Sequence, residues 1–120
     1  MRTNFNNEGR TFSPLAGINL KDMGEVLLEC DEQITISTDT GVGNDITRKS
    51  WGFYLSNSLN HTLRKRGFRT ALVLSDYTES PTLFINIVEE AKIEEFLDYL
   101  SEVRARVLTW LDTWVPGTND

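Results

Sequence analysis

The sequence has little of several residues that specialised sites require. Its 120 residues include one cysteine, Cys30, and one histidine, His61. A single cysteine excludes an intrachain disulfide framework and a paired-thiol metal site. A single histidine excludes a multi-histidine zinc or iron centre within one chain. We therefore expect no metal site and no cofactor.

Long apolar runs are also missing. No stretch approaches the ~20 apolar residues that span a bilayer, and Met1 to Asn7 is polar, unlike the apolar part of a signal peptide. We therefore expect a cytoplasmic protein without a membrane segment. Hydrophobic residues make up 39% and charged residues 25% of the chain, which is typical of globular proteins. We predict a partly flexible arm over 1–20, one domain over 21–115 and a flexible tail over 116–120.

Acidic residues are absent from the middle of the chain. Residues 46–75 contain six bases and no Asp or Glu, whereas residues 1–45 carry eight acids against three bases and residues 76–120 carry ten against three. Because the net charge is −6, nucleic-acid binding is expected only as a local event, if at all. The basic segment either attracts an external anion or is neutralised by the acidic flanks, and the sequence leaves both open.

The first half of the chain predicts short strands and one helix. Val26–Cys30 and Gln33–Thr38 resemble strands, and in the second of these Ile34 and Ile36 alternate with polar residues. Residues 38–45 are loop-like in composition. For residues 50–66 we favour a helix, because Trp51, Leu55, Leu59 and Leu63 recur at a spacing of four, with Ser50 as the N-cap and Gly67 just beyond the C-terminus. A strand at the start of this segment is the alternative, since Gly52 disfavours a helix.

The second half predicts a hairpin and a helix. Residues 70–75 and 82–88 are β-rich runs joined by a polar turn with a proline, so they predict an antiparallel hairpin. From Ala91 onward, apolar residues recur at helical period until Pro116. The alternative ends this helix near Glu102 and makes residues 106–111 a fifth strand. The resulting order, β-β-α-β-β-α, predicts an α+β two-layer sandwich: an antiparallel sheet of four or five strands with helices on one face.

The basic segment supplies the candidate binding residues. Cations interleaved with aromatic side chains are typical of sites for a phosphorylated ligand, a base or a sugar. On the predicted helix, one face carries Asn57, Asn60, His61 and Arg64. The candidate ligand-binding residues are Arg48, Lys49, Tyr54, Asn57, Arg64, Arg66 and Arg69.

His61 is the only candidate catalytic residue. Its ordinary pKa near 6.5 suits proton transfer at neutral pH, but no serine or cysteine accompanies it in a recognisable motif. Cys30 lies beside Asp31 and Glu32, an acidic setting that disfavours a reactive thiolate, so we expect a buried and inert cysteine.

Trp110 and Trp114, one helical turn apart in the predicted last helix, are candidate interface residues. A small two-layer domain leaves one sheet face free, so we expect a homodimer.

The sequence thus favours a non-enzymatic accessory domain. We expect residues 46–69 to bind an anionic small molecule or an acidic protein partner. The alternatives are a small enzyme, or enzyme subunit, that acts on a sugar or nucleotide derivative with His61 as general base, and local nucleic-acid binding.

Overall fold

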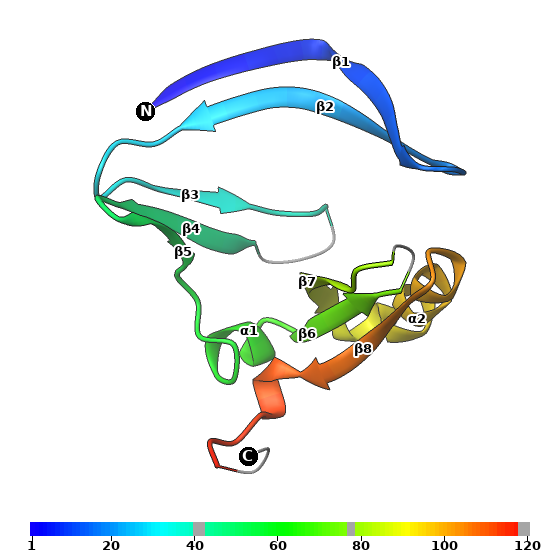
Figure 1. Ribbon diagram of the computed structural model, residues 1–120. Coiled ribbons are helices and arrows are strands. Elements are labelled where there is room, and N and C mark those ends of the chain that lie inside the picture. Colours follow the sequence, from blue (N-terminus) through cyan, green and yellow to red (C-terminus); the bar gives the residue numbers. More distant parts are fainter. Residues whose placement is uncertain (40–42, 77–78, 118–120) are drawn as a thin grey trace. The chain divides into compact units, whose positions relative to one another are not determined.

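The computed structural model describes residues 1–39, 43–76 and 79–117 (Figure 1). Within these residues the secondary structure is mostly β. The strands are β1 (Arg2–Leu15), β2 (Ile18–Leu27), β3 (Gln33–Ile36), β4 (Asn44–Lys49), β5 (Gly52–Leu55), β6 (Phe68–Ser75), β7 (Thr82–Glu89) and β8 (Ala105–Trp110). The helices are α1 (Thr62–Lys65), α2 (Ile93–Glu102) and the short 3-10 helices η1 (Glu90–Lys92) and η2 (Leu111–Thr113).

The described strands form three small sheets, in the orders β1-β2, β3-β4-β5 and β7-β6-β8. The predicted two-layer α+β sandwich, built on one sheet of four or five strands, is therefore wrong. The chain divides into two compact units, one comprising Met1–Thr35 and Asp45–Leu55, the other Ile36–Asn44 and Ser56–Asp120. The domain boundaries predicted at residues 20 and 115 stay a prediction.

In the first unit, the N-terminal residues form a long antiparallel hairpin of β1 and β2. The strands pair from Arg2 opposite Leu27 to Leu15 opposite Ile18. Residues of little periodicity thus form a paired strand, with register shifts between Phe5 and Arg10 and between Phe12 and Leu15. The partial flexibility expected for residues 1–20 stays a prediction. The strand predicted over residues 26–30 is displaced, because β2 ends at Leu27 and Leu28–Cys30 lie beyond it.

A second hairpin, formed by β4 and β5, occupies the start of the predicted helix. Arg48 pairs with Phe53 and Lys49 with Gly52 across an antiparallel ladder. Gly52 has a φ of +146°, a backbone conformation that glycine adopts without the steric cost of a side chain. The helix predicted over residues 50–66 is therefore wrong, and the strand alternative is confirmed for its first part.

Only the last turn of that predicted helix is helical. The helix α1 begins after His61 and comprises four residues, so Ser50 is not its N-cap. Gly67 follows the C-cap residue Arg66 and has a φ of +87°, the left-handed conformation that commonly ends a helix. The predicted role of Gly67 is confirmed.

The second unit contains the predicted hairpin of β6 and β7, which is confirmed. The two strands pair without irregularity from Phe68 opposite Glu89 to Ser75 opposite Thr82. On its other side β6 pairs with β8, and the register shifts between Leu72 and Val73. The alternative with a strand after Glu102 is thus correct, and the single helix from Ala91 to Pro116 is wrong.

The helix α2 covers one face of this sheet. Ala71, Val73 and Leu100 form the buried core cluster, and the partly buried Phe96, Ala105, Val107 and Trp110 pack against it. Phe96 and Leu100, one helical turn apart, provide the side of α2 that packs against this core. The chain leaves the helix at Arg104, which has a φ of +56°, and then reverses into β8.

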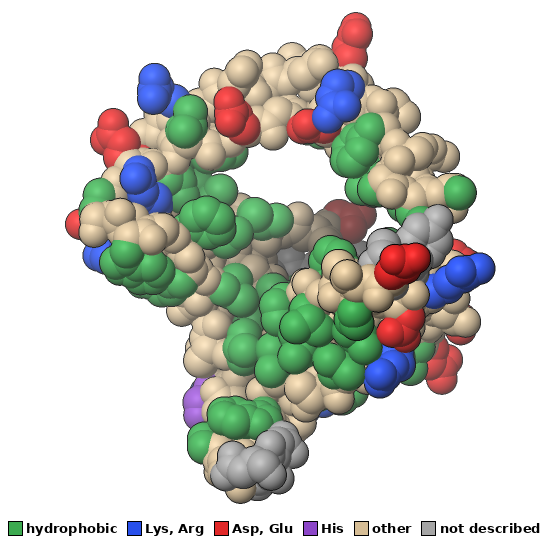
Figure 2. Space-filling view, viewed as in Figure 1, with side chains coloured by type: hydrophobic (Ala, Val, Ile, Leu, Met, Phe, Trp, Pro, Cys, Tyr) green, Lys and Arg blue, Asp and Glu red, His purple; other side chains and the backbone are tan. Residues whose placement is uncertain are grey.

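The opposite face of the sheet is less well covered. Because side chains alternate along a strand, Leu72 and Leu74 of β6 point away from the core residues Ala71 and Val73. Both are only half-buried, and Leu83 and Ile85, opposite them on β7, are exposed. Figure 2 shows hydrophobic side chains gathered over β6 and β8.

Candidate groove and open strand edge

The basic segment does not form one site. Arg48 and Lys49 belong to the first unit, whereas Arg64, Arg66 and Arg69 belong to the second. Each of these five cations already has a partner within its own unit. Their partners decide what the segment can bind.

In the first unit, both cations contact the loop before β3. Arg48 donates from Nη1 to the carbonyl of Leu28 at 2.7 Å, and Lys49 pairs with Asp31. The hydrogen bond from Lys49 lowers the pKa of the Asp31 carboxyl below its ordinary value of 3.8, and it raises the pKa of Lys49 above 10.5. These contacts tie the β4–β5 hairpin to its neighbouring loop.

The aromatic residues of this hairpin are exposed. Trp51 stacks on Tyr54 with ring centroids 5.9 Å apart, and Trp51 and Phe53 are each more than two-thirds exposed. The predicted combination of aromatic rings with nearby cations therefore exists at this hairpin, but its cations are occupied by internal acceptors.

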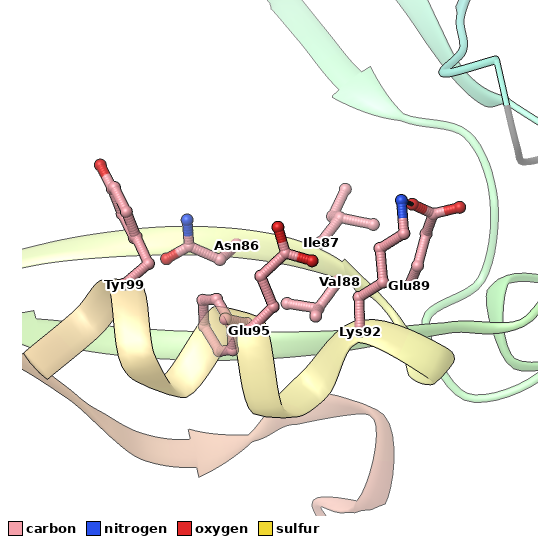
Figure 3. Close-up of a pocket in the computed structure, with 8 residues that line it drawn as sticks. Asn86, Ile87, Val88, Glu89, Lys92, Glu95 and Tyr99 are labelled. Carbon is pink, nitrogen blue, oxygen red and sulfur yellow. Dashed lines mark ion pairs between the residues drawn. The ribbon is translucent and has the colours of Figure 1, made fainter. Parts of the chain in front are cut away.

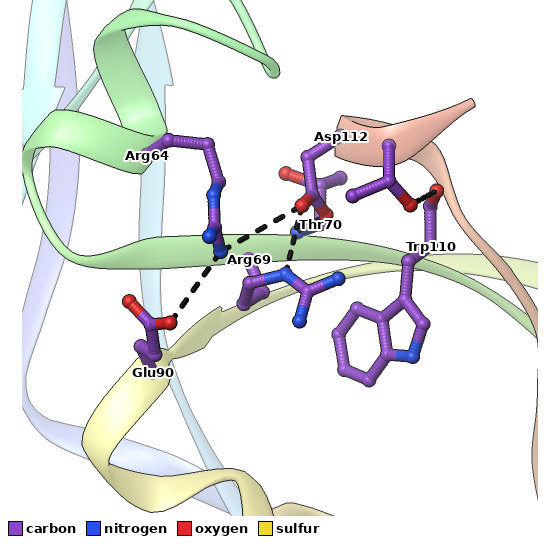
Figure 4. A network of polar contacts seen from close by, with 7 residues as sticks. Arg64, Arg69, Thr70, Glu90, Trp110 and Asp112 are labelled. Atoms are coloured by element: carbon purple, nitrogen blue, oxygen red, sulfur yellow. Dashed lines mark hydrogen bonds and ion pairs between the residues drawn. The ribbon is translucent and has the colours of Figure 1, made fainter. Parts of the chain in front are cut away.

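In the second unit, Arg64 and Arg69 converge on one buried carboxylate, Asp112 (Figure 4). Its side chain has no solvent-exposed surface. Oδ2 accepts a hydrogen bond from Nε of Arg69 at 2.7 Å, and Oδ1 accepts one from the backbone N–H of Thr70 at 3.0 Å. The Arg69 guanidinium also lies over the ring of Trp110, 4.4 Å from its centroid. Because a buried charge requires such pairing, this cluster holds η2 and the end of β8 against β6.

Arg64 and Arg66 are also engaged. Nη1 of Arg64 lies 3.7 Å from Glu90 and 3.8 Å from Asp112, distances at which it forms ion pairs without hydrogen bonds. Arg66 donates to the carbonyl of Gly43 at 2.7 Å. Lys65, the remaining base of the segment, is exposed. An external anion at Arg64 or Arg69 therefore competes with Asp112.

The other predicted site residues are dispersed. His61 is exposed and precedes α1, whereas Asn57 is buried in the preceding loop. The predicted stripe of Asn57, His61 and Arg64 on one helix face is not formed, because α1 is too short to contain it. Trp110 packs edge-on against Phe96 in the core, and Trp114 is 47% exposed. Of the loop predicted over 38–45, residues 40–42 lie outside the described residues.

A groove lies between β7 and α2 (Figure 3). Its volume is about 320 Å³. In Figure 3, α2 runs alongside β7, and Tyr99, Glu95 and Ile87 project to the same open side. Lys92 and Glu89 form an ion pair of 3.2 Å at one end. The lining residues are Asn86, Ile87, Val88, Glu89, Lys92, Glu95, Phe96 and Tyr99.

The groove borders an open strand edge. In the described residues, β7 pairs on one side with β6 and has no strand on the other. The backbone N–H of Glu90 bonds to the carbonyl of Gly67 at 2.8 Å. Since bonded and non-bonded pairs alternate along an antiparallel ladder, the backbone groups of alternate residues point outward. These residues are Leu83, Ile85, Ile87 and Glu89.

The two edges of this sheet differ in how they are protected. The edge strand β8 is interrupted by the register shift and carries Arg106, features that discourage pairing with another chain. The edge strand β7 contains neither lysine nor proline, and its ladder with β6 is regular. Leu83, Phe84 and Ile85 are each more than half exposed. Thus β7 is the unprotected edge.

Sequence reasoning missed this groove. The strand β7 and the start of α2 were predicted, but an edge position requires the full strand order, which depends on β8. Asn86, a polar residue inside an apolar run, was the one available signal. It faces α2, since it lies opposite the core residue Ala71.

The described residues contain no cluster of three or more His, Cys, Asp or Glu side chains that suits a metal ion. None of the described helices is long and apolar enough to cross a membrane. Comparison of the chain with protein-family models, curated proteins and solved structures finds no match.

Proposed function

We propose that this chain is a non-enzymatic binding domain that takes up an extended segment of a partner protein beside β7. The observation that carries the proposal is the unprotected edge of β7, with a groove beside its last four residues, 86–89. An extended peptide adds to such an edge through backbone hydrogen bonds, while the neighbouring groove receives alternate side chains. The cytoplasmic location expected from the sequence for this protein is retained as part of the proposal.

This arrangement supports strand addition better than anion binding by the basic segment. The exposed β7 edge offers outward N–H and C=O groups at Leu83, Ile85 and Ile87, and these groups have no strand partner in the described residues. By contrast, Arg64 and Arg69 already pair with carboxylates of the same unit. The anionic ligand and the acidic partner expected from the sequence are therefore not retained as the leading proposal.

The enzyme alternative has less support. His61 does not line the groove, although a general base must lie within reach of its substrate. Catalysis by His61 and nucleic-acid binding stay predictions.

The homodimer also stays a prediction. The exposed Leu83 and Ile85, on the sheet face away from α2, are the observation that favours it. Sedimentation of the purified protein over a range of concentrations measures it directly.

Strand addition is testable by removing one outward backbone donor. In Ile85→Pro, the ladder with β6 is retained because the N–H of Ile85 points away from it, and an edge strand tolerates proline in this position. The matched control is Ile85→Ala, which removes the side chain but keeps the N–H. The probe is a short fluorescent peptide of alternating valine and glutamine. We expect Ile85→Ala to bind the peptide and Ile85→Pro to lose binding in fluorescence anisotropy.

Hydrogen exchange on the unmodified protein gives a second measurement that does not depend on the variant's folding. Bound peptide should slow exchange at the outward amides of Ile85 and Ile87, while the inward amide of Asn86 is already protected by β6. Equal binding by Ile85→Pro and wild type, or unchanged exchange at saturating peptide, would overturn the proposal.

A further inference from the structure

We propose that the segment received beside β7 is basic, with Lys or Arg on the side chains that face α2. This inference rests on the proposed function and names the chemistry of the partner. It follows from the charge of the groove wall, from the spacing of its residues and from the small number of cations that pair with this wall among the described residues.

The wall formed by the end of β7, η1 and α2 is strongly acidic. Its only base in the described residues is Lys92, which pairs with Glu89. Glu90 is engaged by Arg64. The remaining acids have no ion-pair partner among the described residues: Glu94, Glu95, Asp98 and Glu102. Of these four, Glu95 lines the groove itself.

The spacing of an added strand matches that of the helix beside it. Same-face side chains of a strand are about 7 Å apart, and residues one turn apart on a helix are about 6 Å apart along its axis. Two successive same-face residues of the partner therefore reach Glu95 and Tyr99. A Lys or Arg opposite Glu95 meets an unpaired carboxylate, and its aliphatic stem packs against the exposed ring of Tyr99.

The same charges argue against a second copy of this chain as the occupant. Antiparallel pairing of β7 with β7 of another copy produces one continuous sheet with both α2 helices on the same face. Each α2 helix carries unpaired acids and no base of its own. The two acidic helices would therefore lie on either side of the β7–β7 interface. Repulsion between these like charges opposes dimer formation through β7, whereas a basic segment is attracted to the acidic groove wall.

The test uses three labelled peptides of equal length, in which valine alternates with lysine, glutamine or glutamate. Fluorescence anisotropy is measured at low and high salt. We expect the lysine peptide to bind most tightly and to lose this advantage at high salt. Glu95→Gln should weaken binding of the lysine peptide about two- to fivefold, as expected for one exposed ion pair. The matched control is Glu94→Gln, on the same helix but outside the groove, which should have the smaller effect.

The outcomes separate this inference from the proposed function. If the three peptides bind equally, or the glutamate peptide binds best, the inference is wrong and strand addition stands. If none of them binds, both fail. If sedimentation shows a dimer that Ile85→Pro abolishes, and peptides do not compete with this pairing, a second copy is the occupant and the inference is also wrong.

Discussion

The carboxylate of Asp112 accepts a hydrogen bond from the guanidinium of Arg69 at 2.7 Å, and the two residues are 43 positions apart in the chain. The same carboxylate accepts a hydrogen bond from the backbone N–H of Thr70. Because its side chain is fully buried, this one residue links η2 to the start of β6.

We predict that Asp112→Ala destabilises the second unit by about 3 kcal/mol, since it leaves a part-buried guanidinium and a buried N–H without their acceptor. Asp112→Asn should destabilise the unit less, because the side-chain amide oxygen still accepts a hydrogen bond from the backbone N–H of Thr70. Urea unfolding measures both variants. The exposed substitution Glu94→Gln is the control, and a loss no larger than the control's would show that the cluster contributes little.

Gly24 lies where β1 and β2 approach closely. It has a φ of +119°, and an added Cβ would lie 2.0 Å from the carbonyl oxygen of Asn4. Gly24→Ala should therefore open the hairpin and speed amide exchange in β1 and β2. Gly17→Ala is the matched control, because Gly17 also has a positive φ but nothing lies within 4 Å of the added Cβ. Similar exchange in the two variants would contradict the predicted clash.

The pair of Lys49 and Asp31 predicts a pH window for the β4–β5 hairpin. The pKa of Asp31 is lowered, so its contribution is present above its unfolded value of 3.8 and is lost as pH falls through the folded pKa. The pKa of Lys49 is raised, so its contribution is present below 10.5 and is lost as pH rises through the folded pKa. In Asp31→Asn, an NMR titration should return the pKa of Lys49 toward 10.5. An unchanged titration would exclude the pairing in solution.

Cys30 is exposed, so the expectation of a buried cysteine is wrong. It lies in the loop between β2 and β3, beyond the strand end at which it was placed. We predict that a thiol reagent modifies one equivalent of the native protein without prior unfolding. Cys30→Ser is the control. Modification of Cys30 only after denaturant is added would contradict its exposed position.

Local patterns predicted the elements whose side chains bury one face. The β6–β7 hairpin was correct because two β-rich runs flank a polar turn with a proline. The start of α2 was correct because its apolar residues recur at helical period. The end of α2 was missed because Arg104, and not a glycine, adopts the left-handed conformation there. The helix over 50–66 was wrong because a spacing of four arose by coincidence across a strand, a loop and a short helix.

The candidate site was less accessible to such reasoning. Charge segregation was visible in the sequence, but the sequence left open whether the bases were neutralised internally. That answer depends on contacts between distant positions, such as Arg69 with Asp112. The open edge of β7 also depends on the order of three strands, which local patterns do not contain.

The exposed row of backbone groups on β7 has a consequence for handling the protein. At neutral pH the net charge of −6 opposes association between molecules. Near the isoelectric point of about 4.7, the net charge of the whole molecule vanishes while the apolar strand stays uncovered. We expect concentrated samples to form ordered, dye-binding fibres in mildly acidic buffer, and storage well above that pH to prevent them.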